Sequence, residues 1–280
     1  MQLNEDKLVH AVAADNQVRC VAAVTTALVG EAARRHETAP AASVALGRTL
    51  TGALLLGGGV KDLERVTVHF QCDGPIGNIF AQANPRGHVR GYVSNPKADT
   101  TEANSFGKVD VRGVVGNGRM YVIRDAGFEI GLLKEPYRGT VPITSGEIAQ
   151  DFAYYLTVSE QVNSGVSLGV VIKIEGPDGN ASYRNFNTPE FDIDHLRVTA
   201  AGGYIVQMMP GADEKLISRL EKSLSSAPPS TEMVMNGLTP AEMLRAALGD
   251  VDLTILEEME PRFQCQCSHE RALLIISALG

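Results

Sequence analysis

The chain has 280 residues, of which 44% are hydrophobic, and it carries a formal net charge of -8 with a sequence pI near 5.3. This length and composition exclude a disordered or fibrous chain, because the apolar residues suffice for one large core or two smaller ones. The acidic balance argues against a general nucleic-acid surface, which needs clustered Lys and Arg. The N-terminus is polar and acidic, and no run reaches the roughly 18 apolar residues of a membrane span. We therefore expect a cytoplasmic protein that binds neither nucleic acid nor a membrane.

The first two thirds of the chain mix strand and helix patterns. Residues 17–24 are strand-like, 25–36 have apolar residues at helical spacing, and 41–56 predict a helix that is apolar nearly all round. Short strands are predicted at 65–72, 78–83, 88–93, 119–125 and 168–174. Residues 173–200, rich in Gly, Pro, Asn and Asp, predict a long surface hairpin or insertion, and 201–211 a last strand. The predicted fold class is α+β, with a mixed α/β-layer domain at the front.

After residue 211 the pattern becomes helical. One helix has its apolar stripe at Leu216, Ile217, Leu220 and Leu224. Pro228-Pro229 ends that helix, and Thr239-Pro240-Ala-Glu242 is a capping box with Pro at the first helical position of a second helix, which ends at Gly249. From Leu238 to Arg262 there are six acids and two bases, which predicts a segment solvated on one face and docked on the other. We place a domain boundary between 211 and 214.

Two of the four cysteines, Cys265 and Cys267, stand two residues apart, ahead of an apolar helix. Thiolates at this spacing can share a soft metal ion such as zinc, or close on each other as a strained, easily reduced disulfide. The alternative is two incidental thiols on a turn before the helix. A structural zinc takes four ligands, and no Cys-x-x-Cys follows before Gly280. His269 is the nearest further candidate ligand, although a solvent-facing residue in the first helical turn is the simpler interpretation.

The last helix is predicted to begin after Ser268, whose side chain can cap it. Its apolar residues are too many to be left in water, so we expect them to be buried. They are Leu273, Leu274, Ile275, Ile276 and Leu279.

Other candidate residues favour structure over chemistry. Cys20 and Cys72 lie in strand-like segments, where free cysteine commonly acts as a small core residue. Gly57-Gly58-Gly59 follows a helix instead of opening one, so a turn or C-cap is favoured over a phosphate loop. No pairing of acid and base is visible among the acidic residues, so we expect no enzyme active site. These acids are Asp125, Glu129, Glu135 and Glu147.

Short motifs occur in a characteristic order over nearly the whole chain. They are Gly47-Arg48-Thr49, Asp73-Gly-Pro-Ile-Gly77, Val93-Ser-Asn-Pro96, Gly107-Lys-Val-Asp-Val111, Ser145-Gly-Glu-Ile148, Tyr154-Tyr-Leu156, Ser159-Glu-Gln161, Gly202-Gly203, Gln207-Met-Met-Pro-Gly211, Leu238-Thr-Pro240 and Cys265-x-Cys267-Ser. Together they resemble the heat-shock protein 33 family, the redox-regulated bacterial holdase chaperones.

The resemblance implies three parts: an N-terminal α+β chaperone core domain at 1–212, a helical linker region at 213–262, and the start of a C-terminal zinc domain at 263–280. It also implies that reduced Cys265 and Cys267 ligate zinc, and that oxidation releases the metal and joins them in a disulfide. The linker then loosens, and apolar surface binds unfolding client proteins. A homodimer is implied by the resemblance only. The chain differs from the family pattern in its longer insertion and in lacking the second cysteine pair.

The expected function is a redox-regulated, ATP-independent holdase that prevents aggregation of unfolding proteins under heat and oxidative stress. Without the second cysteine pair, we expect weak zinc binding and partial constitutive activity, because a small domain without its metal folds poorly. An alternative is a thiol-disulfide oxidoreductase that uses Cys265 and Cys267 as a dithiol couple, which catalytic turnover would distinguish. A third is a domain-swapped structural dimer without clients.

Overall fold

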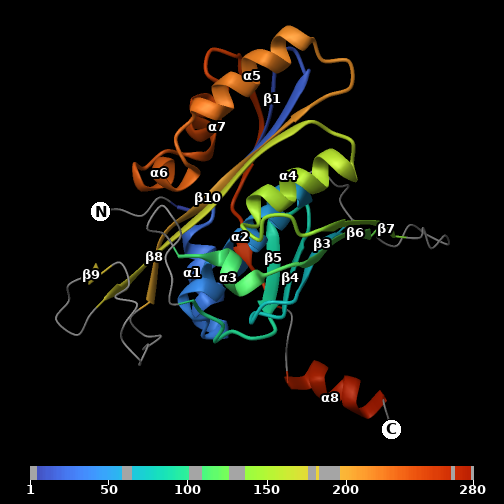
Figure 1. Ribbon diagram of the computed structural model, residues 1–280, viewed down its shortest axis with the longest axis vertical. Helices are drawn as coiled ribbons and strands as arrows, with labels where there is room; N and C mark the ends of the chain where they lie inside the picture. Colours follow the sequence, from blue (N-terminus) through green and yellow to red (C-terminus); the bar gives the residue numbers. More distant parts are fainter. Residues whose placement is uncertain are drawn as a thin grey trace.

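The computed structural model describes residues 5–58, 65–100, 109–125, 136–175, 181–182, 196–265 and 269–278. These residues form two six-stranded sheets, called sheet A and sheet B below, with helices between them and on the far face of sheet A (Figure 1). The predicted α+β class is confirmed.

Sheet A has the order β11-β1-β2-β10-β8-β9, and all its neighbouring strands are antiparallel. Its strands are β1 (Lys7–Ala13), β2 (Val18–Val24), β8 (Ser164–Glu175), β9 (Ala181–Ser182), β10 (Leu196–Met208) and β11 (Leu253–Met259). The long strands β8 and β10 include 173–175 and 196–200, so the strands extend into the segment predicted as an insertion. Residues 176–180 and 183–195 lie outside the described residues.

Sheet B has the order β12-β5-β4-β3-β6-β7, antiparallel except for the parallel pair β12 and β5. Its strands are β3 (Arg65–Cys72), β4 (Asn78–Ala83), β5 (His88–Val93), β6 (Gly118–Asp125), β7 (Tyr137–Pro142) and β12 (Arg262–Phe263). Buried and more exposed residues alternate along β4 and β5, as expected for a sheet with one face on the core and one in solvent.

Helix α2 (Pro40–Gly57) fills the space between the two sheets, and every residue in it except Arg48 is buried. The absence of a polar face explains why its sequence is apolar nearly all round. Glycines allow close packing around it: a Cβ at Gly52 would lie 2.4 Å from the ring of Phe152. Three further helices line this core: α1 (Thr26–His36), α3 (Val111–Val115) and α4 (Ala149–Val158).

The opposite face of sheet A is covered by three helices from the C-terminal part of the chain (Figure 1). They are α5 (Glu214–Ser226), α6 (Ser230–Met235) and α7 (Pro240–Leu248). The predicted capping box of α7 is confirmed: Thr239 accepts from the Glu242 N–H, and the Glu242 carboxylate accepts from the Thr239 N–H at 2.8 Å. Gly249 ends the helix with φ +68°, a conformation that favours glycine.

The helical prediction for 213–262 is wrong at its end, where β11 and β12 are strands. β11 pairs with the edge strand β1, and β12 with the edge strand β5. Both pairings join residues more than 170 positions apart, so local periodicity could not reveal them. Strands β1 and β7 were also missed, although their partners β2 and β6 are close in the sequence, because each is a short strand stabilised by packing against its neighbour. The division of the chain into domains stays a prediction.

Helix α8 (His269–Ala278) is present as predicted, but the expected burial of its apolar residues is wrong. Leu273, Leu274 and Ile276 are 51%, 69% and 64% exposed. Figure 1 shows the helix away from both sheets, in agreement with this exposure. Ser268, Ile275 and Leu279 lie outside the part of the chain whose side chains are described.

We predict that Gly52→Ala lowers the free energy of unfolding by about 1–3 kcal/mol, because the new methyl group overpacks against Phe152. Gly30→Ala is the matched control: it is also helical, but its Cβ would meet Val198 at an ordinary 3.9 Å. That variant should gain up to about 1 kcal/mol from higher helix propensity. Urea unfolding monitored by circular dichroism measures both, and equal effects of the two variants would contradict the packing argument.

Candidate functional site

Cys265 lies two positions after the end of strand β12, at the edge of sheet B. The Arg262 N–H donates to the Gly87 carbonyl at 2.9 Å, and the Gln264 N–H donates to the Val89 carbonyl at 2.8 Å. Cys265 itself is half-buried, and Cys267 lies outside the described residues. The backbone ladder therefore holds the chain up to the residue before the first cysteine of the predicted pair.

The side chain of Phe263 holds strand β12 against the core. It packs against the main core, and its ring meets the His36 ring edge-on, with 6.1 Å between centroids. The guanidinium of Arg35 lies 5.8 Å from the centre of the same ring, within cation–π distance. Burial lowers the pKa of His36, so its neutral form is favoured beside Arg35. The C-terminal turn of α1 thus anchors the segment that leads to the cysteines.

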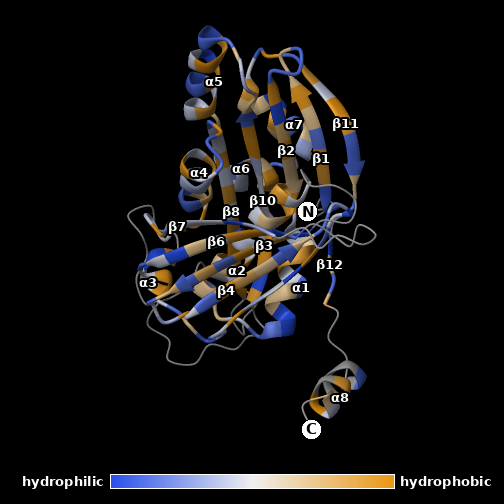
Figure 2. Ribbon diagram, turned by 90° about the vertical axis from the view of Figure 1, so that its right-hand side faces the viewer, coloured by the Kyte–Doolittle hydropathy of each residue, from blue (hydrophilic) through white to orange (hydrophobic). Residues whose placement is uncertain are grey.

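Residues 253–265, here called the tail segment, connect the edges of the two sheets. β11 extends sheet A beside β1 (Figure 2), and β12 pairs with β5 at the edge of sheet B. Between them, Asp6 accepts hydrogen bonds from the N–H groups of Ala27 and Leu28 at 3.0 and 2.7 Å and so holds the start of β1 to α1. Burial raises the pKa of Asp6 to about 6. The tail segment therefore pairs with an edge of each sheet before the chain reaches Cys265.

Cys20 and Cys72 are core residues, as predicted. Cys20 is fully buried in β2, and Cys72 is half-buried at the end of β3 and packs against the main core. Burial raises the pKa of each thiol to about 12, and Asp73 and Asp151 add to the effect at Cys72. Both thiols are protonated at neutral pH and are poor nucleophiles and metal ligands.

The zinc hypothesis is only half matched by the donors in this chain. Cys265 and Cys267 provide two soft thiolates, and a tetrahedral structural site needs four ligands. Among the described residues, no group of three or more His, Cys, Asp or Glu side chains is arranged to hold a metal ion. Residue 269 begins α8, but its side chain lies outside the described part.

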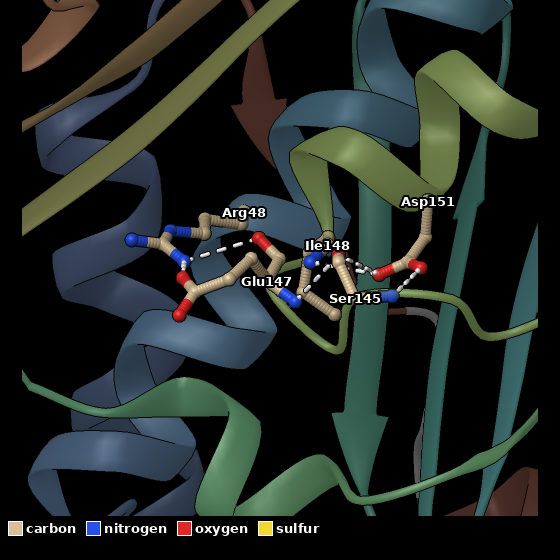
Figure 3. A network of polar contacts seen from close by, with 5 residues as sticks. All are labelled: Arg48, Ser145, Glu147, Ile148 and Asp151. Atoms are coloured by element: carbon tan, nitrogen blue, oxygen red, sulfur yellow. Dashed lines mark hydrogen bonds and ion pairs between the residues drawn. The ribbon is translucent and has the colours of Figure 1, made fainter. Parts of the chain in front are cut away.

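Two motifs noted in the sequence meet in one polar network, shown in Figure 3. The Arg48 guanidinium donates to the Glu147 carboxylate at 2.8 Å and to its backbone carbonyl at 3.1 Å. The buried carboxylate of Asp151 accepts from the N–H groups of Ser145 and Ile148 at 2.9 and 3.1 Å, and from the Ser145 hydroxyl at 2.9 Å. These bonds satisfy loop donors that would otherwise be buried and unpaired.

The network has a structural role. Ile148 has φ +67°, which is unusual for a β-branched residue, and the bonds to Asp151 stabilise this strained position at the start of α4. The ion pair of Arg48 ties the same loop to α2. The Gly47-Arg48-Thr49 and Ser145-Gly-Glu-Ile148 motifs therefore join α2 to the loop before α4.

Comparison with known proteins gives consistent matches over the whole chain. The family model described as "Hsp33 protein" matches residues 6–280. The chain belongs to the Hsp33 family. A 33 kDa chaperonin of Clostridium botulinum is 43% identical over 99% of this chain and 85% of its own length. One from Bacillus subtilis is 45% identical over 98% of this chain and 86% of its own length.

The Hsp33 fold is matched by a crystal structure as well. The 33 kDa chaperonin of Thermotoga maritima, a heat shock protein 33 homolog, has a TM-score of 0.82 at 32% identity. The match covers 99% of this chain and 86% of that one. Within the described residues, no helix has the length and apolar character needed to cross a membrane.

Sequence reasoning found the cysteine pair of this Hsp33 chain but missed the tail segment that positions it. The parallel pairing of β12 involves two residues, Arg262 and Phe263, which is too short for a strand pattern. The only local signal was an aromatic residue, Phe263, two positions before Cys265. The role of Phe263 as an anchor becomes visible only when the fold places α1 beside it.

We predict that iodoacetamide at pH 8, added to the reduced native protein with a chelator, alkylates Cys265 and Cys267 well before Cys20 and Cys72. A thiol with a pKa of about 12 is ionised to about one part in ten thousand at this pH, compared with about a quarter for an unperturbed thiol. Peptide mass spectrometry gives the rates, and a difference of at least about 100-fold is expected. In urea all four should react alike. Early native labelling of Cys72 would contradict the assignment.

Proposed function

We propose that this chain is an ATP-independent holdase chaperone, regulated by the redox state of Cys265 and Cys267. Membership of the Hsp33 family and the names of the relatives, 33 kDa chaperonins, support the chaperone role. They offer no support for the oxidoreductase alternative. One observation carries the proposal. A large apolar face of sheet A is covered by helices, and these helices belong to the part of the chain that leads to the cysteines.

That face is the outer side of sheet A. Its apolar residues, including Val9, Ala22 and Val206, are covered by side chains of α5, α6 and α7. The covering side chains include Leu220, Met233, Met243, Leu244 and Leu248, all of them nearly fully buried. If these helices detach, the exposed sheet face is a surface that unfolded clients can bind by the hydrophobic effect.

The cover is coupled to the cysteines along the chain. α7 ends at Leu248, β11 begins at Leu253, and Cys265 follows β12 after two residues. A disturbance at Cys265 that frees β12 and β11 removes the C-terminal anchor of α5 to α7. The β12 pairing has only two residue pairs, Arg262 with His88 and Phe263 with Val89, so a modest local change is sufficient to free this end of the tail segment first.

The redox step we propose is the oxidation of two thiols to a disulfide. Cys265 and Cys267 lose two electrons and two protons and form one S–S bond, while a peroxide is reduced, in the case of hydrogen peroxide to two waters. When reduced, the same sulfurs are the proposed zinc ligands. Homodimer formation and a cytoplasmic location are also proposed, on the resemblance to the family.

We predict that this chain suppresses aggregation of a heat-unfolded client about stoichiometrically and without nucleotide. Light scattering should show partial suppression by the reduced protein with chelator and stronger suppression after peroxide treatment. The double variant Cys265→Ser and Cys267→Ser should lose the increase after peroxide, whereas Cys72→Ser should keep it.

Each outcome of this assay is informative. No suppression in any state would contradict the holdase proposal. Suppression that is equal in all states would retain the chaperone and reject control by the pair. Reduction of many substrate disulfides per chain would instead favour the oxidoreductase.

We also predict that Leu244→Ala raises chaperone activity in the reduced state. Leu244 is fully buried between α7 and sheet A, and truncation of such a residue costs about 2–5 kcal/mol. The loss weakens the docking of the helical cover. Leu256→Ala is the control, because Leu256 is 63% exposed on β11. Light scattering measures activity, and bis-ANS binding measures exposed apolar surface. Unchanged activity together with increased dye binding would show that this face does not bind clients.

A further inference from the structure

The strands of sheet B have a charge opposite to that of the whole chain. The chain has a net charge of -8, but strands β3 to β7 contain five arginines and one acidic residue, Asp125. The arginines are Arg65, Arg90, Arg119, Arg124 and Arg138. Arg124 is paired with Glu160 at 3.3 Å, and the other four alternate along the strands with residues of the buried face. The outer face of this sheet is therefore locally cationic.

Strand register places four rings of this face in one row. Tyr92 of β5 is opposite Phe80 of β4, Phe80 is opposite His69 of β3, and His69 is opposite Tyr121 of β6. Phe80 and Tyr92 are stacked with 5.6 Å between ring centroids, and His69 and Tyr121 with 5.7 Å. Because strands are spaced by about 4.8 Å, the row spans about 14 Å. We call these four residues the ring row.

Polar contacts on the same face hold the ring row in place. His69 Nε2 lies 2.9 Å from Asn78 Oδ1, and the Tyr121 hydroxyl donates to Gln71 Oε1 at 3.2 Å. Tyr92 is the most accessible ring, at 49% exposure. Figure 2 shows these strands toward the viewer with α2 behind them, so the helix packs on the other face. The rings are thus pre-ordered and accessible within the described part of the chain.

Arginines flank the ring row on both sides. On one side of the ring row, the next row of outward-facing residues has Arg90 of β5 at one end and Arg138 of β7 at the other. On the other side of the ring row, Arg119 of β6 lies two positions before Tyr121 on the same strand. Arg90 is held by two hydrogen bonds to the neutral Gln82 amide oxygen, at 2.7 and 3.2 Å. Within the described residues, Arg65, Arg119 and Arg138 make no ion pair. Their charges are therefore available to an anionic ligand.

A shallow hollow lies at the β5 end of this surface. Its lining includes Arg65, Gln82, Asn84, His88, Arg90 and Gln264. Amide groups next to arginines provide donors and acceptors of the kind that bind phosphates and base edges.

We propose that the outer face of sheet B binds single-stranded nucleic acid. Sequence-tolerant binding of single strands combines a cationic surface that follows the backbone with aromatic rings on which bases stack. Both features occur here on one open sheet. A duplex is a poor fit, because its bases are already stacked and a flat sheet does not enter its grooves. This ligand is consistent with the acidic composition, since the charge is arranged locally.

The proposal does not depend on the holdase function, because it uses a different sheet. The client face proposed above is on sheet A under α5 to α7, and the ring row is on sheet B. The two proposals can therefore fail separately, and the test below is designed to distinguish them.

The test is fluorescence anisotropy of the full reduced chain with labelled 15-nucleotide oligo(U) RNA and oligo(dT) DNA at low salt. We expect saturable binding of one or both single strands, weaker binding of the matched duplex, and a decrease in affinity with rising salt. Comparison of RNA with DNA shows whether the 2′-hydroxyl contributes. Inorganic polyphosphate carries negative charge but no bases. Competition with it therefore distinguishes binding by charge alone from binding that also needs stacking.

Two variants test the ring row and the arginines. Tyr92→Ala should weaken binding by at least about fivefold, the lower limit for loss of one stacked base, and Tyr92→Phe should restore it. Arg119→Gln should weaken binding of all sequences and reduce the salt dependence by about one phosphate contact. Tyr137→Ala is the control. Tyr137 is also 49% exposed on sheet B, but it alternates with the outward-facing Arg138 and so lies on the opposite side of the sheet from the ring row. Urea unfolding confirms that each variant is folded.

Several outcomes would overturn the proposal. One is the absence of binding by the folded wild-type protein. Another is displacement by polyphosphate with no effect of Tyr92→Ala, which would mean charge alone. A third is that Tyr92→Ala leaves nucleic-acid binding unchanged but impairs client protection, which would assign the ring row to clients.

Discussion

The fold depends on the burial of helix α2 between two sheets. Its residues are enclosed on nearly every side, so both sheets must present an apolar inner face, and small residues are needed where strands and α4 approach closely. The single partly exposed residue, Arg48, is used to hold the loop before α4. With the inner faces committed to this core, each sheet has only its outer face and its edges left for other contacts. Those surfaces differ in chemistry.

The edges are joined by the tail segment. An unpaired edge strand exposes a row of backbone donors and acceptors, and the chain satisfies two such edges with β11 and β12. Because β12 has only two paired residues and ends next to Cys265, its stability depends on the Phe263 contacts with α1. In the proposed redox control, this arrangement would connect Cys265 to the helices that cover sheet A. It needs no long-range change in the core.

The outer faces of the two sheets differ in chemistry. The outer face of sheet A is apolar and is covered by α5 to α7, which suits a surface that binds unfolded protein when uncovered. The outer face of sheet B carries rings and arginines held by hydrogen bonds, which suits a planar, anionic ligand. Gln264 lines the hollow on sheet B and is adjacent to Cys265. The tail segment therefore borders both sheets.

The sequence alone determined the fold class, helices α1 and α2, seven strands of the two sheets, the α7 cap and the cysteine pair, whereas α3 and α4 were not predicted. Each of these depends on neighbouring residues: a continuous run of small and apolar residues predicts α2, Thr239 and Glu242 are three positions apart, and Cys265 and Cys267 are two apart. The order of motifs also identified the family. Local patterns could not show that residues 253–263 are strands, because their partners β1 and β5 are more than 170 positions away.

Only the tertiary structure decided what surrounds the cysteine pair and where the charges lie. The composition indicated an acidic protein without a nucleic-acid surface, but strand register brings arginines from four separate strands onto one face. Likewise, the apolar residues of α8 predicted burial, while three of them are exposed. Burial and local charge depend on which segments meet in space, and this is set by long-range pairing and packing instead of by neighbours in the chain.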